Sequence, residues 1–373
     1  MDFSINKEQD FFRQETIRFA RENLNTPDTL EDFSEKMWKK VSDYGLLGIT
    51  VGEQFGGLNE SYTTAAIVFE ALGYSCKNNG LIFVINNHIW VSQNLIYLYG
   101  SEELKEKYLS EMVKGNRIGA IAITEADSGS DALSLATTAT EDNEFYVLNG
   151  SKMFISNGPI ADIFVVFART SINSISAFVV EKQFDGFKVC PNIQKMGLGG
   201  CPTSEIIFNN CRVPKENILG NINQGAFLLN LALEWERCFE FVPHIGVMQR
   251  IMEECTEHVN SRMQFDKYLS EYQAVTHKIS DMKIAIEMAR MMLYKITWLK
   301  DHGKTAYVET SIFKVFVSEN YIKTCRDAIQ IFGAYGYTKE YDYERELRDA
   351  LASSIYSGTN EMQRNTIFNM LNF

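Results

Sequence analysis

Apolar residues recur at helical spacing through the first third of the chain. Amphipathic helices are predicted where apolar positions lie three and four residues apart, over residues 8–22, 35–44, 62–72 and 102–112. Glycine disfavours continuation of a helix, so Gly73 and Gly100 are expected to end helices. We therefore predict a helical N-terminal domain over residues 1–116.

The pattern changes to short β-rich runs in the middle of the chain. Strands are predicted over residues 146–148, 152–155, 163–168, 176–180 and 205–208. Asn149-Gly150 separates the first two runs, and this dipeptide favours a tight turn, so a hairpin is expected there. We predict a central domain over residues 117–222 that forms a small β-barrel or sandwich.

Long helical periodicity returns after Gly225 and continues to the end of the chain. Helices are predicted over residues 226–263, 273–301, 305–332 and 360–371. Pro243 is expected to kink or interrupt the first of them, because proline removes a backbone hydrogen bond. The expected fold is multidomain α+β, with a helical bundle over residues 223–373 as its last domain.

Composition narrows the class of function. The 373 residues carry a net charge of -12, which argues against binding to nucleic acid or to an anionic membrane surface. The seven cysteines form no C-x-x-C pair, and the five histidines show no metal-binding spacing. No apolar run approaches the length of a membrane span. A soluble protein of the reducing cytoplasm is expected.

Two motifs in the central domain can present polar groups to a ligand. Residues 124–131, TEADSGSD, follow an apolar run, and their small side chains let backbone N–H groups approach a phosphate closely. In residues 149–158, NGSKMFISNG, Phe154 and Ser156 point to one face of a strand and suit a planar heteroaromatic ring. The competing interpretations are a polar loop and a core phenylalanine beside an exposed serine. No G-x-G-x-x-G lies between a strand and a helix, which disfavours a Rossmann nicotinamide site.

Three further motifs lie in the C-terminal domain. Arg262-Met263-Gln264-Phe265 offers a guanidinium for a phosphate and an aromatic ring for an adenine. Residues 330–337, QIFGAYGY, form a glycine-containing turn after a helix. Near the end of the chain, Ser357-Gly358 breaks the pattern, Thr359 is a good N-cap, and Glu361 lies in the first turn of the last helix. Each motif alone also fits an ordinary helix end.

Taken in this order, the motifs resemble those of the acyl-CoA dehydrogenase family, over essentially the whole chain. The resemblance rests on TEADSGSD, NGSKMFISNG, KMGLGG, VPKENILG, RMQF, QIFGAYGYTKEY and YSGTNEMQR. It implies an N-terminal α-helical domain, a central β-barrel domain and a C-terminal four-helix bundle. It also implies bound FAD, a homo-oligomer (a dimer or a dimer of dimers) and α,β-dehydrogenation of an acyl thioester.

The resemblance also implies roles for individual residues around FAD. Thr124 and the backbone near Ile123 would meet the flavin ring, Ser130 its pyrophosphate, and Phe154 and Ser156 the isoalloxazine. A neighbouring subunit would supply Arg262, Phe265, Gln330 and Gly333, with Gln273 close by. Thr359 would hold the cofactor from the final helix, and the predicted binding set is completed by Ile121, Gly129 and Glu361.

The chain departs from most of the family at the catalytic base. The usual glutamate stands immediately before the terminal Gly-Thr, where this chain has Ser357, and a serine hydroxyl is not an unaided base near pH 7. Some members, such as isovaleryl-CoA dehydrogenase, place the glutamate before an arginine on the first bundle helix. Glu236-Arg237 stands there, so Glu236 is predicted to be the general base, and Glu236, Arg237 and Ser357 form the predicted catalytic set.

The alternative interpretation of Glu236 is a solvated helix carboxylate, with Glu234 and Glu240 as rivals nearby. Glu240 shares its helix face, whereas Glu234 points elsewhere. Glu236 can serve as the base only if burial raises its pKa toward the working pH. The resemblance implies that the thioester carbonyl is polarised by a flavin ribityl hydroxyl and a backbone N–H beside the terminal motif.

The combination of Trp235-Glu236-Arg237 with the terminal Ser-Gly-Thr-Asn resembles a branch of the family that acts on carrier-protein-bound substrates in polyketide and non-ribosomal peptide pathways. Prolyl-carrier oxidation and the formation of aminomalonyl or hydroxymalonyl units are examples. A catabolic short- or branched-chain acyl-CoA dehydrogenase is the alternative, and a catalytically silent flavin-binding scaffold is a second. The electron acceptor would be an electron-transfer flavoprotein or oxygen.

Overall fold

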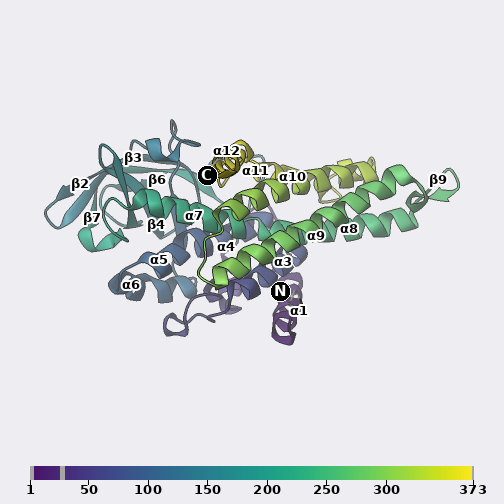
Figure 1. The fold of residues 1–373 in the computed structure, drawn as a ribbon, viewed down its shortest axis with the longest axis horizontal. Helices are drawn as coiled ribbons and strands as arrows, with labels where there is room; N and C mark the ends of the chain where they lie inside the picture. The colour runs from purple at the N-terminus through teal and green to yellow at the C-terminus, as the bar shows by residue number, and fades with distance from the viewer. Residues whose placement is uncertain (1–3, 26–29, 372–373) are drawn as a thin grey trace.

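A computed structural model describes residues 4–25 and 30–371 of the chain. The first three and last two residues of the predicted domains lie outside this part. The helices and strands follow the predicted order of a helical domain, a β-domain and a helical bundle, so the predicted fold class is confirmed (Figure 1). The predicted boundaries fall between elements, at residues 113–119 and 219–225, and they stay predictions.

The N-terminal domain contains α1 (Lys7–Asn23), α2 (Glu35–Asp43), α3 (Tyr62–Ser75), α4 (Asn79–His88), the π-helical η4 (Ile89–Gln93), α5 (Asn94–Tyr99) and α6 (Glu102–Val113). The side chains of Ser34, Ser61 and Ser101 cap α2, α3 and α6 by accepting backbone N–H groups. The four predicted helices are therefore present. The segment from α4 to α5 was not predicted, because its residues are almost all buried and leave no polar face to reveal a period.

The prediction that Gly73 ends a helix is wrong, because it lies inside α3. A Cβ atom at this position would lie 2.0 Å from the carbonyl oxygen of Pro243 in the bundle. Glycine is therefore needed here for close packing of two helices and not for a turn. Gly100, in contrast, is the C-cap of α5, as predicted.

The β-domain contains β1 (Gly119–Ala122), β2 (Thr138–Asp142), β3 (Phe145–Ser156), β4 (Ile163–Ser171), β5 (Ser174–Glu181), β6 (Phe187–Val189), β7 (Thr203–Pro214) and β8 (Ile218–Leu219). They form one sheet in the order β6-β7-β3-β2-β4-β5-β8, with β1 pairing in parallel with β4. Antiparallel pairs dominate, and β4 and β5 are buried along almost their whole length.

The predicted hairpin at Asn149-Gly150 is wrong, because both residues lie inside the continuous strand β3. The register between β3 and β7 shifts between Leu148 and Gly150, and Gly150 has φ 141°. The dipeptide therefore makes a β-bulge and not a reversal of the chain. The reversal occurs earlier, at Asn143, which adopts φ 50° between β2 and β3.

The bundle contains α7 (Gly225–Phe239), α8 (Val242–Ser261), α9 (Gln273–Asp301), α10 (Tyr307–Phe332), α11 (Tyr343–Ala352) and α12 (Asn360–Leu371), and a small hairpin of β9 (Met263–Gln264) and β10 (Lys267–Tyr268) joins α8 to α9. Pro243 lies in the first turn of α8 and interrupts the first helix as predicted. Only α11 was not predicted as a separate helix. Short 3₁₀ turns cover Leu46–Gly48, Glu53–Phe55, Ala132–Ser134, Lys215–Asn217, Leu269–Glu271 and Tyr335–Tyr337.

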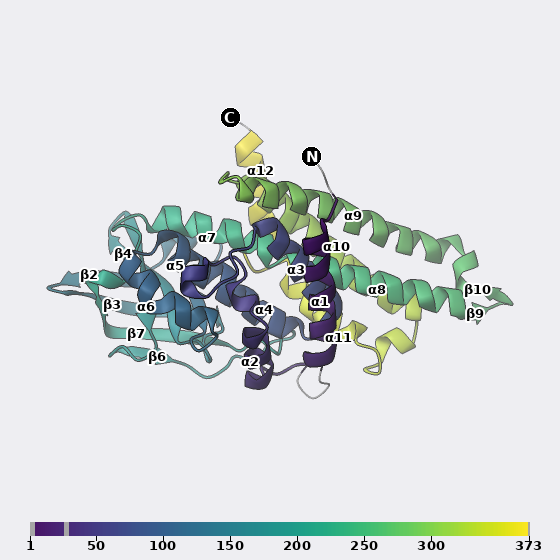
Figure 2. The same cartoon turned by 90° about the horizontal axis from the view of Figure 1, so that it is seen from below.

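The molecule is elongated, with the β-domain at one end and the β9–β10 hairpin at the other (Figures 1 and 2). The N-terminal helices cover the middle, where α3 packs against α8 and α7 against β5. Residues that belong to one predicted cofactor site therefore come from widely separated elements.

Candidate active site

The chain turns sharply just before α12. Ser357 and Gly358 both adopt left-handed backbone conformations, with φ 59° and 79°. Thr359 Oγ1 accepts the N–H of Met362 at 3.3 Å, which confirms the predicted N-cap. Glu361 lies in the first turn, where its own backbone N–H and the Thr359 hydroxyl lower its pKa. The turn and the capped helix are therefore as predicted.

Two side chains, those of Arg237 and Gln363, hold this turn by donating to its carbonyl groups. Arg237 Nε donates to the Ser357 carbonyl at 3.2 Å, and Gln363 Nε2 donates to the carbonyls of Ser357 and Gly358 at 3.1 and 3.0 Å. Arg237 is buried, and its guanidinium lies 5.4 Å from the centre of the Tyr307 ring. Because the carbonyls point toward these donors, the N–H groups of Ser357 and Gly358 take no acceptor within the described residues.

Glu236 lies on α7 beside this turn. Burial raises the pKa of its carboxyl, while the Ser357 hydroxyl and the charges of Arg237 and Lys314 lower it in part. Some of its side chain is still accessible, as expected for a group that faces a cavity. The Ser357 hydroxyl is near enough to influence Glu236, but it makes no hydrogen bond of normal geometry with any described residue. Glu236 is thus a desolvated carboxyl next to the position where most of the family has its base.

Lys314 on α10 completes this charged group. Its side chain is fully buried, and Nζ lies 2.6 Å from the Asn360 Oδ1 that begins α12. Burial and the neighbouring Arg237 lower its pKa to about 8, although the charges of Glu361 and Glu236 raise it in part. Two cations therefore face a single partly accessible carboxyl.

The two rival carboxylates differ in their contacts. Glu234 is fixed by an ion pair with Lys300 and by the Ala306 N–H at 2.6 Å, on another side of α7. It is therefore occupied by a structural interaction. Glu240, one turn beyond Glu236, is buried, and burial and the charge of Glu236 raise its pKa well above the ordinary value.

The 124–131 loop is held by a buried ion pair. Glu125 accepts the N–H groups of Ala136 and Thr137 at 2.6 and 3.0 Å and pairs with Lys152 Nζ at 2.8 Å. Around this anchor the loop exposes Gly129 and Ser130, and a Cβ on Gly129 would meet nothing within 4 Å. The loop therefore offers unobstructed backbone to a ligand, which is what a phosphate needs.

Phe154 and Ser156 lie where β3 is irregular. The register shifts between Lys152 and Ile155, and Phe154 adopts φ 59°, which is costly for a bulky side chain. Phe154 is 60% exposed, whereas Ile155 is buried. An aromatic ring held outward against a backbone cost is a feature of binding sites more than of cores.

The other predicted residues of this part are less accessible. Thr124 is partly exposed, and its carbonyl accepts the Met153 N–H at 2.8 Å. The Ile123 carbonyl accepts Lys152 Nζ at 3.0 Å. Ile121 is buried within β1 and pairs with Val165, so its role toward a cofactor stays a prediction.

A short segment after β3 joins the β-domain to the helices around Glu236. Asn157 Nδ2 donates to the carbonyls of Val84 on α4 and Gly119 on β1 at 3.1 and 3.0 Å. The buried Cys201 is close enough to Ser156 and Glu240 for both to affect its thiol pKa, which burial raises to about 11. Ser156 and Glu240 thus both lie near one buried thiol.

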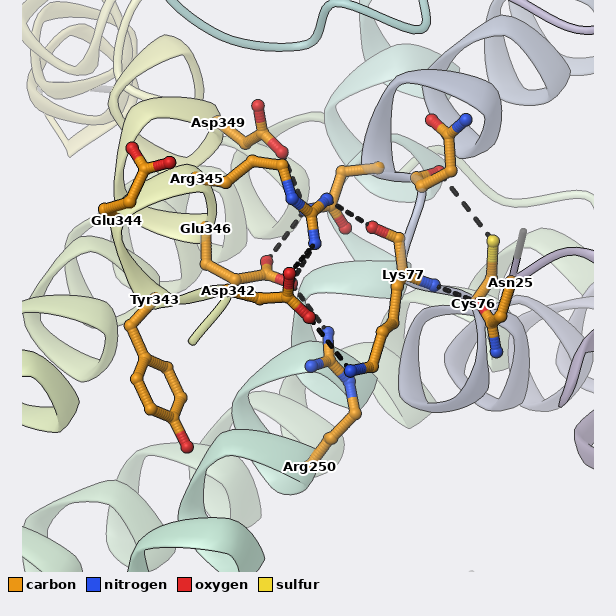
Figure 3. Close-up of polar contacts among 12 residues, drawn as sticks. Asn25, Cys76, Lys77, Arg250, Asp342, Tyr343, Glu344, Arg345, Glu346 and Asp349 are labelled. Carbon is orange, nitrogen blue, oxygen red and sulfur yellow. Dashed lines mark hydrogen bonds and ion pairs between the residues drawn. The ribbon is translucent and has the colours of Figure 1, made fainter. Parts of the chain in front are cut away.

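A buried ionic network holds the helices behind the site (Figure 3). Arg250 of α8 pairs with Glu346 of α11 at 2.9 Å, and Lys77 pairs with Asp342 at 2.9 Å. Asp349 accepts the N–H of Leu198 at 2.6 Å, and burial raises its pKa to about 6. The network joins α8 and α11 to the segment just before α4.

The five remaining predicted cofactor residues lie elsewhere. Arg262 is the C-cap of α8, Phe265 lies in the β9–β10 turn, Gln273 begins α9, and Gln330 and Gly333 end α10. The rings of His258 and Phe332 stack at 4.1 Å and bring the ends of α8 and α10 together. This end of the bundle is far from the β-domain (Figure 1), so the structure does not bring these five to Glu236 within one chain.

Three residues that shape the site were not predicted. Lys314 interrupts the apolar sequence IFKVF on α10, which is the kind of signal that marks a buried charge. Gln363 could be recognised as a turn-facing residue only after the start of α12 was known. Glu125 gave no signal of its contact with Lys152, which lies 27 positions away.

Known proteins resemble this chain over almost its whole length. The family models for the acyl-CoA dehydrogenase N-terminal, middle and C-terminal domains match residues 6–116, 120–211 and 223–371. The chain is 35% identical to an L-prolyl-[peptidyl-carrier protein] dehydrogenase of Serratia sp., covering 98% of this chain and 97% of that one. It is 37% identical to an acyl-CoA dehydrogenase of Bacillus subtilis, covering 96% and 97%.

Solved structures agree over the full length. The prolyl acyl carrier protein oxidase AnaB has a TM-score of 0.97 at 37% identity, covering 99% of this chain and 100% of that one. The FAD complex of PigA has a TM-score of 0.97 at 35% identity, covering 100% and 99%. This three-domain fold, with a desolvated carboxyl beside the turn before α12, is that of a flavin-dependent dehydrogenase. The chain belongs to the acyl-CoA dehydrogenase family.

Two further properties concern the described residues as a set. None of their helices combines the length and the apolarity that a bilayer span requires. They also contain no group of three His, Cys, Asp or Glu side chains placed to hold a metal ion.

Proposed function

We propose that this protein is an FAD-dependent dehydrogenase that oxidises an acyl or aminoacyl thioester presented on a carrier protein, with Glu236 as its general base. The assignment to FAD and to thioester dehydrogenation follows from the family. The single observation that carries the mechanism is the desolvated Glu236 carboxyl beside Ser357, a residue that cannot itself accept the α-proton.

The residues present fit FAD. The exposed Gly129–Ser130 turn leaves room for a pyrophosphate, and the outward ring of Phe154 offers a flat surface to the isoalloxazine. Thr124, Ser156 and Thr359 would add polar contacts from the two sides of the site. When bound, FAD accepts the hydride that leaves the substrate.

In the reaction, the protein's own groups remove the α-proton of the substrate and form hydrogen bonds to its thioester carbonyl. The Glu236 carboxylate removes the proton from the carbon next to the thioester, and the electron pair of that C–H bond forms the double bond to the adjacent carbon, whose own C–H electron pair leaves as hydride. The unpaired N–H groups at Ser357 and Gly358 are suited to donate hydrogen bonds to the thioester oxygen. Arg237 and Gln363 hold those donors by binding the carbonyls of the same turn.

The carrier-bound substrate is supported by the relatives. Two relatives that match nearly the whole chain are a prolyl-carrier protein dehydrogenase and a prolyl-carrier protein oxidase. Some proteins of this family therefore act on an aminoacyl thioester that is bound to a carrier protein. Catabolic oxidation of a plain acyl-CoA and a silent scaffold are not favoured. The reducing equivalents pass to an electron-transfer flavoprotein or to oxygen, and release of hydrogen peroxide distinguishes them. Seven unpaired cysteines suit the reducing cytoplasm.

Replacing Glu236 with Gln tests the mechanism. The rate of anaerobic flavin reduction by a prolyl thioester of pantetheine or of the carrier protein should fall by roughly 10²- to 10⁴-fold, because a general base is lost. The visible spectrum of bound FAD should not change. Stopped-flow absorbance of the flavin band measures both.

Glu234→Gln is the matched control, since Glu234 lies on the same helix but is bound to Lys300. It is expected to lower stability and to leave reduction of the bound flavin largely intact. If Glu236→Gln reduces its flavin at the wild-type rate, another group is the base and the mechanism is wrong.

A further inference from the structure

A small pocket lies beside Glu236, at the junction of α4, α7 and α8. It is lined by Phe83 and Asn86 of α4 and by Glu240, Pro243 and His244, and its free volume is about 10 Å³. That is room for one group the size of a water molecule, and too little for a further length of acyl chain. The pocket therefore suits a small polar substituent.

The polar groups of this pocket lack partners. Glu240 is 1% exposed, and its Oε1 accepts Asn87 Nδ2 at 3.1 Å, but Oε2 has no hydrogen-bond partner among the described residues. Both polar atoms of the Asn86 amide are also buried without a hydrogen bond of normal geometry, although the amide lies near enough to Glu240 to lower its pKa in part. A buried polar atom without a partner destabilises the folded protein, so a native protein keeps a cluster of them only for a reason.

In the part of the chain that the structure describes, Glu240 has no cationic partner in this pocket. Among the described residues no Lys, Arg or His forms an ion pair with Glu240, whereas Glu236 has Arg237 and Lys314 nearby. His244 adds no positive charge, because burial lowers its pKa to about 3 and its Nε2 shares a hydrogen bond with the Tyr356 hydroxyl at 2.7 Å. Glu240 is thus a buried carboxyl without a cationic partner among these residues, and a protonated amine beside its Oε2 would supply one.

We propose that Glu240, with Asn86, binds a protonated amine carried on the acyl group of the substrate, next to the carbon that Glu236 deprotonates. The proposal rests on the proposed function, because it names a group of the same substrate. Residues i and i+4 on a helix lie on one face, so Glu236 and Glu240 can reach neighbouring atoms of one acyl group. An aminoacyl thioester satisfies both carboxyl groups, whereas a plain acyl group leaves Glu240 unpaired.

Two substrates that differ only in the amine test this site. Prolyl-S-pantetheine and cyclopentanecarbonyl-S-pantetheine share the same ring, with NH₂⁺ replaced by CH₂ in the second. Flavin reduction by each is measured anaerobically with wild-type holoenzyme and with Glu240→Gln, which keeps the acceptor for Asn87. We expect Glu240→Gln to lower the apparent second-order rate constant for the prolyl thioester by roughly 10- to 150-fold and to leave the cyclopentane thioester within about threefold.

The ratio between the two thioesters separates amine recognition from a general defect. Glu253→Gln, the same substitution at an exposed position on α8, should not change the ratio. If Glu240→Gln slows both thioesters equally, or slows neither, Glu240 does not bind the amine. If Glu240→Gln slows neither thioester, the pocket holds only water.

A fragment makes the result independent of the reaction. Prolinamide carries the amine without a thioester, so its binding to the holoenzyme, measured by calorimetry against cyclopentanecarboxamide, does not require turnover. Preference for prolinamide that is lost in Glu240→Gln supports the amine site even if no thioester reduces the flavin, and that last result would count against the proposed function alone. Equal binding of the two amides by wild type overturns the proposal.

Discussion

The behaviour of Glu236 is decided by opposing local effects. Burial disfavours the charged form and raises its pKa, whereas the Ser357 hydroxyl, Arg237 and Lys314 favour the charged form. The net direction is upward, so the carboxyl is a stronger base than in water and still close enough to two cations to ionise. Removing one of these cations should therefore alter catalysis through the base and not through substrate binding.

Replacing Lys314 with Met tests this balance. Without the charge on Nζ the carboxylate is less stabilised, so the Glu236 pKa should rise further. Because the base acts only when ionised, the acid limb of the pH profile for flavin reduction should move to higher pH, by roughly one unit or less. Stopped-flow reduction across pH 5 to 9 measures the shift.

Lys323→Met on the same helix is the control, since Lys323 is partly exposed and pairs with Asp281 and Asp327. It removes an equal charge and should leave the acid limb in place. An acid limb that is unchanged in Lys314→Met, or that moves to lower pH, contradicts the assignment of Glu236 as the ionising base.

Only the cap could be predicted from short spacing, because Thr359 is recognised by its neighbours along the chain. Glu236 was placed by the resemblance to family members with a glutamate before an arginine, and its role as the base stays a prediction. The partners Lys314 and Gln363 could not be identified, because their contacts depend on how α10 and α12 pack. The bulge at Phe154 was also missed, since strand alternation assumes a regular register.

At the scale of elements, the helices α3 and α8 cross with their backbones very close together. A Cβ on Gly246 would lie 2.0 Å from the Glu70 carbonyl oxygen, and one on Gly73 would lie 2.0 Å from the Pro243 carbonyl oxygen. Two glycines that face each other's helix allow the backbones to approach closely. This contact joins the N-terminal domain to the helix that follows Glu236 and Glu240, so it fixes the pocket wall.

Replacing Gly246 with Ala should destabilise the protein. The added methyl group meets backbone atoms of α3, which cannot move aside as a flexible side chain would, and overpacking of this kind typically costs about 1–3 kcal/mol. Urea unfolding followed by circular dichroism measures the change. Glu257→Ala, at an exposed position on the same helix, is the control and should change stability by less than about 0.5 kcal/mol. A Gly246→Ala protein as stable as wild type would show that the crossing is looser than the structure indicates.

Element prediction was accurate where periodicity was strong and failed where a local signal had two meanings. The helix α9 agrees with its predicted range from residue 273 to 301, because a long amphipathic pattern leaves little choice. Asn149-Gly150 suits both a turn and a bulge, and only pairing with β7 selects the bulge. The segment from α4 to α5 shows no period because both its faces are buried.

At the scale of the whole molecule, the predicted cofactor residues form two groups at opposite ends. One group surrounds the 124–131 loop and Glu236, and the other lies at the β9–β10 end of the bundle. Phe265 of the second group is 89% exposed, and Tyr337, which follows α10 and was not in the predicted set, is 81% exposed. Phe265 also adopts φ 53°, a costly conformation for a bulky residue, in the tight turn of the hairpin.

Exposed aromatic residues of this kind mark interfaces in soluble proteins. We therefore infer that a second copy of the chain brings its β9–β10 end to the FAD of the first, so that the protein is a homo-oligomer. The two groups of residues then complete one cofactor site between them, and neither group alone does so. Loss of the contact should accordingly affect both the mass of the assembly and the retention of FAD.

Phe265→Asp is the direct test, because it places a charge in the proposed contact and removes the ring proposed to cover the adenine. The variant should run at a lower mass in size exclusion with light scattering, and the ratio of flavin to protein absorbance should fall after desalting. Ile172→Asp, at a position that is 84% exposed in the β4–β5 connection, is the matched control and should change neither. A Phe265→Asp protein with wild-type mass and full FAD would refute the shared site, and the five residues at the bundle end would then need a different role. A variant that keeps its mass but loses FAD would show that the aromatic ring binds the cofactor without holding the subunits together.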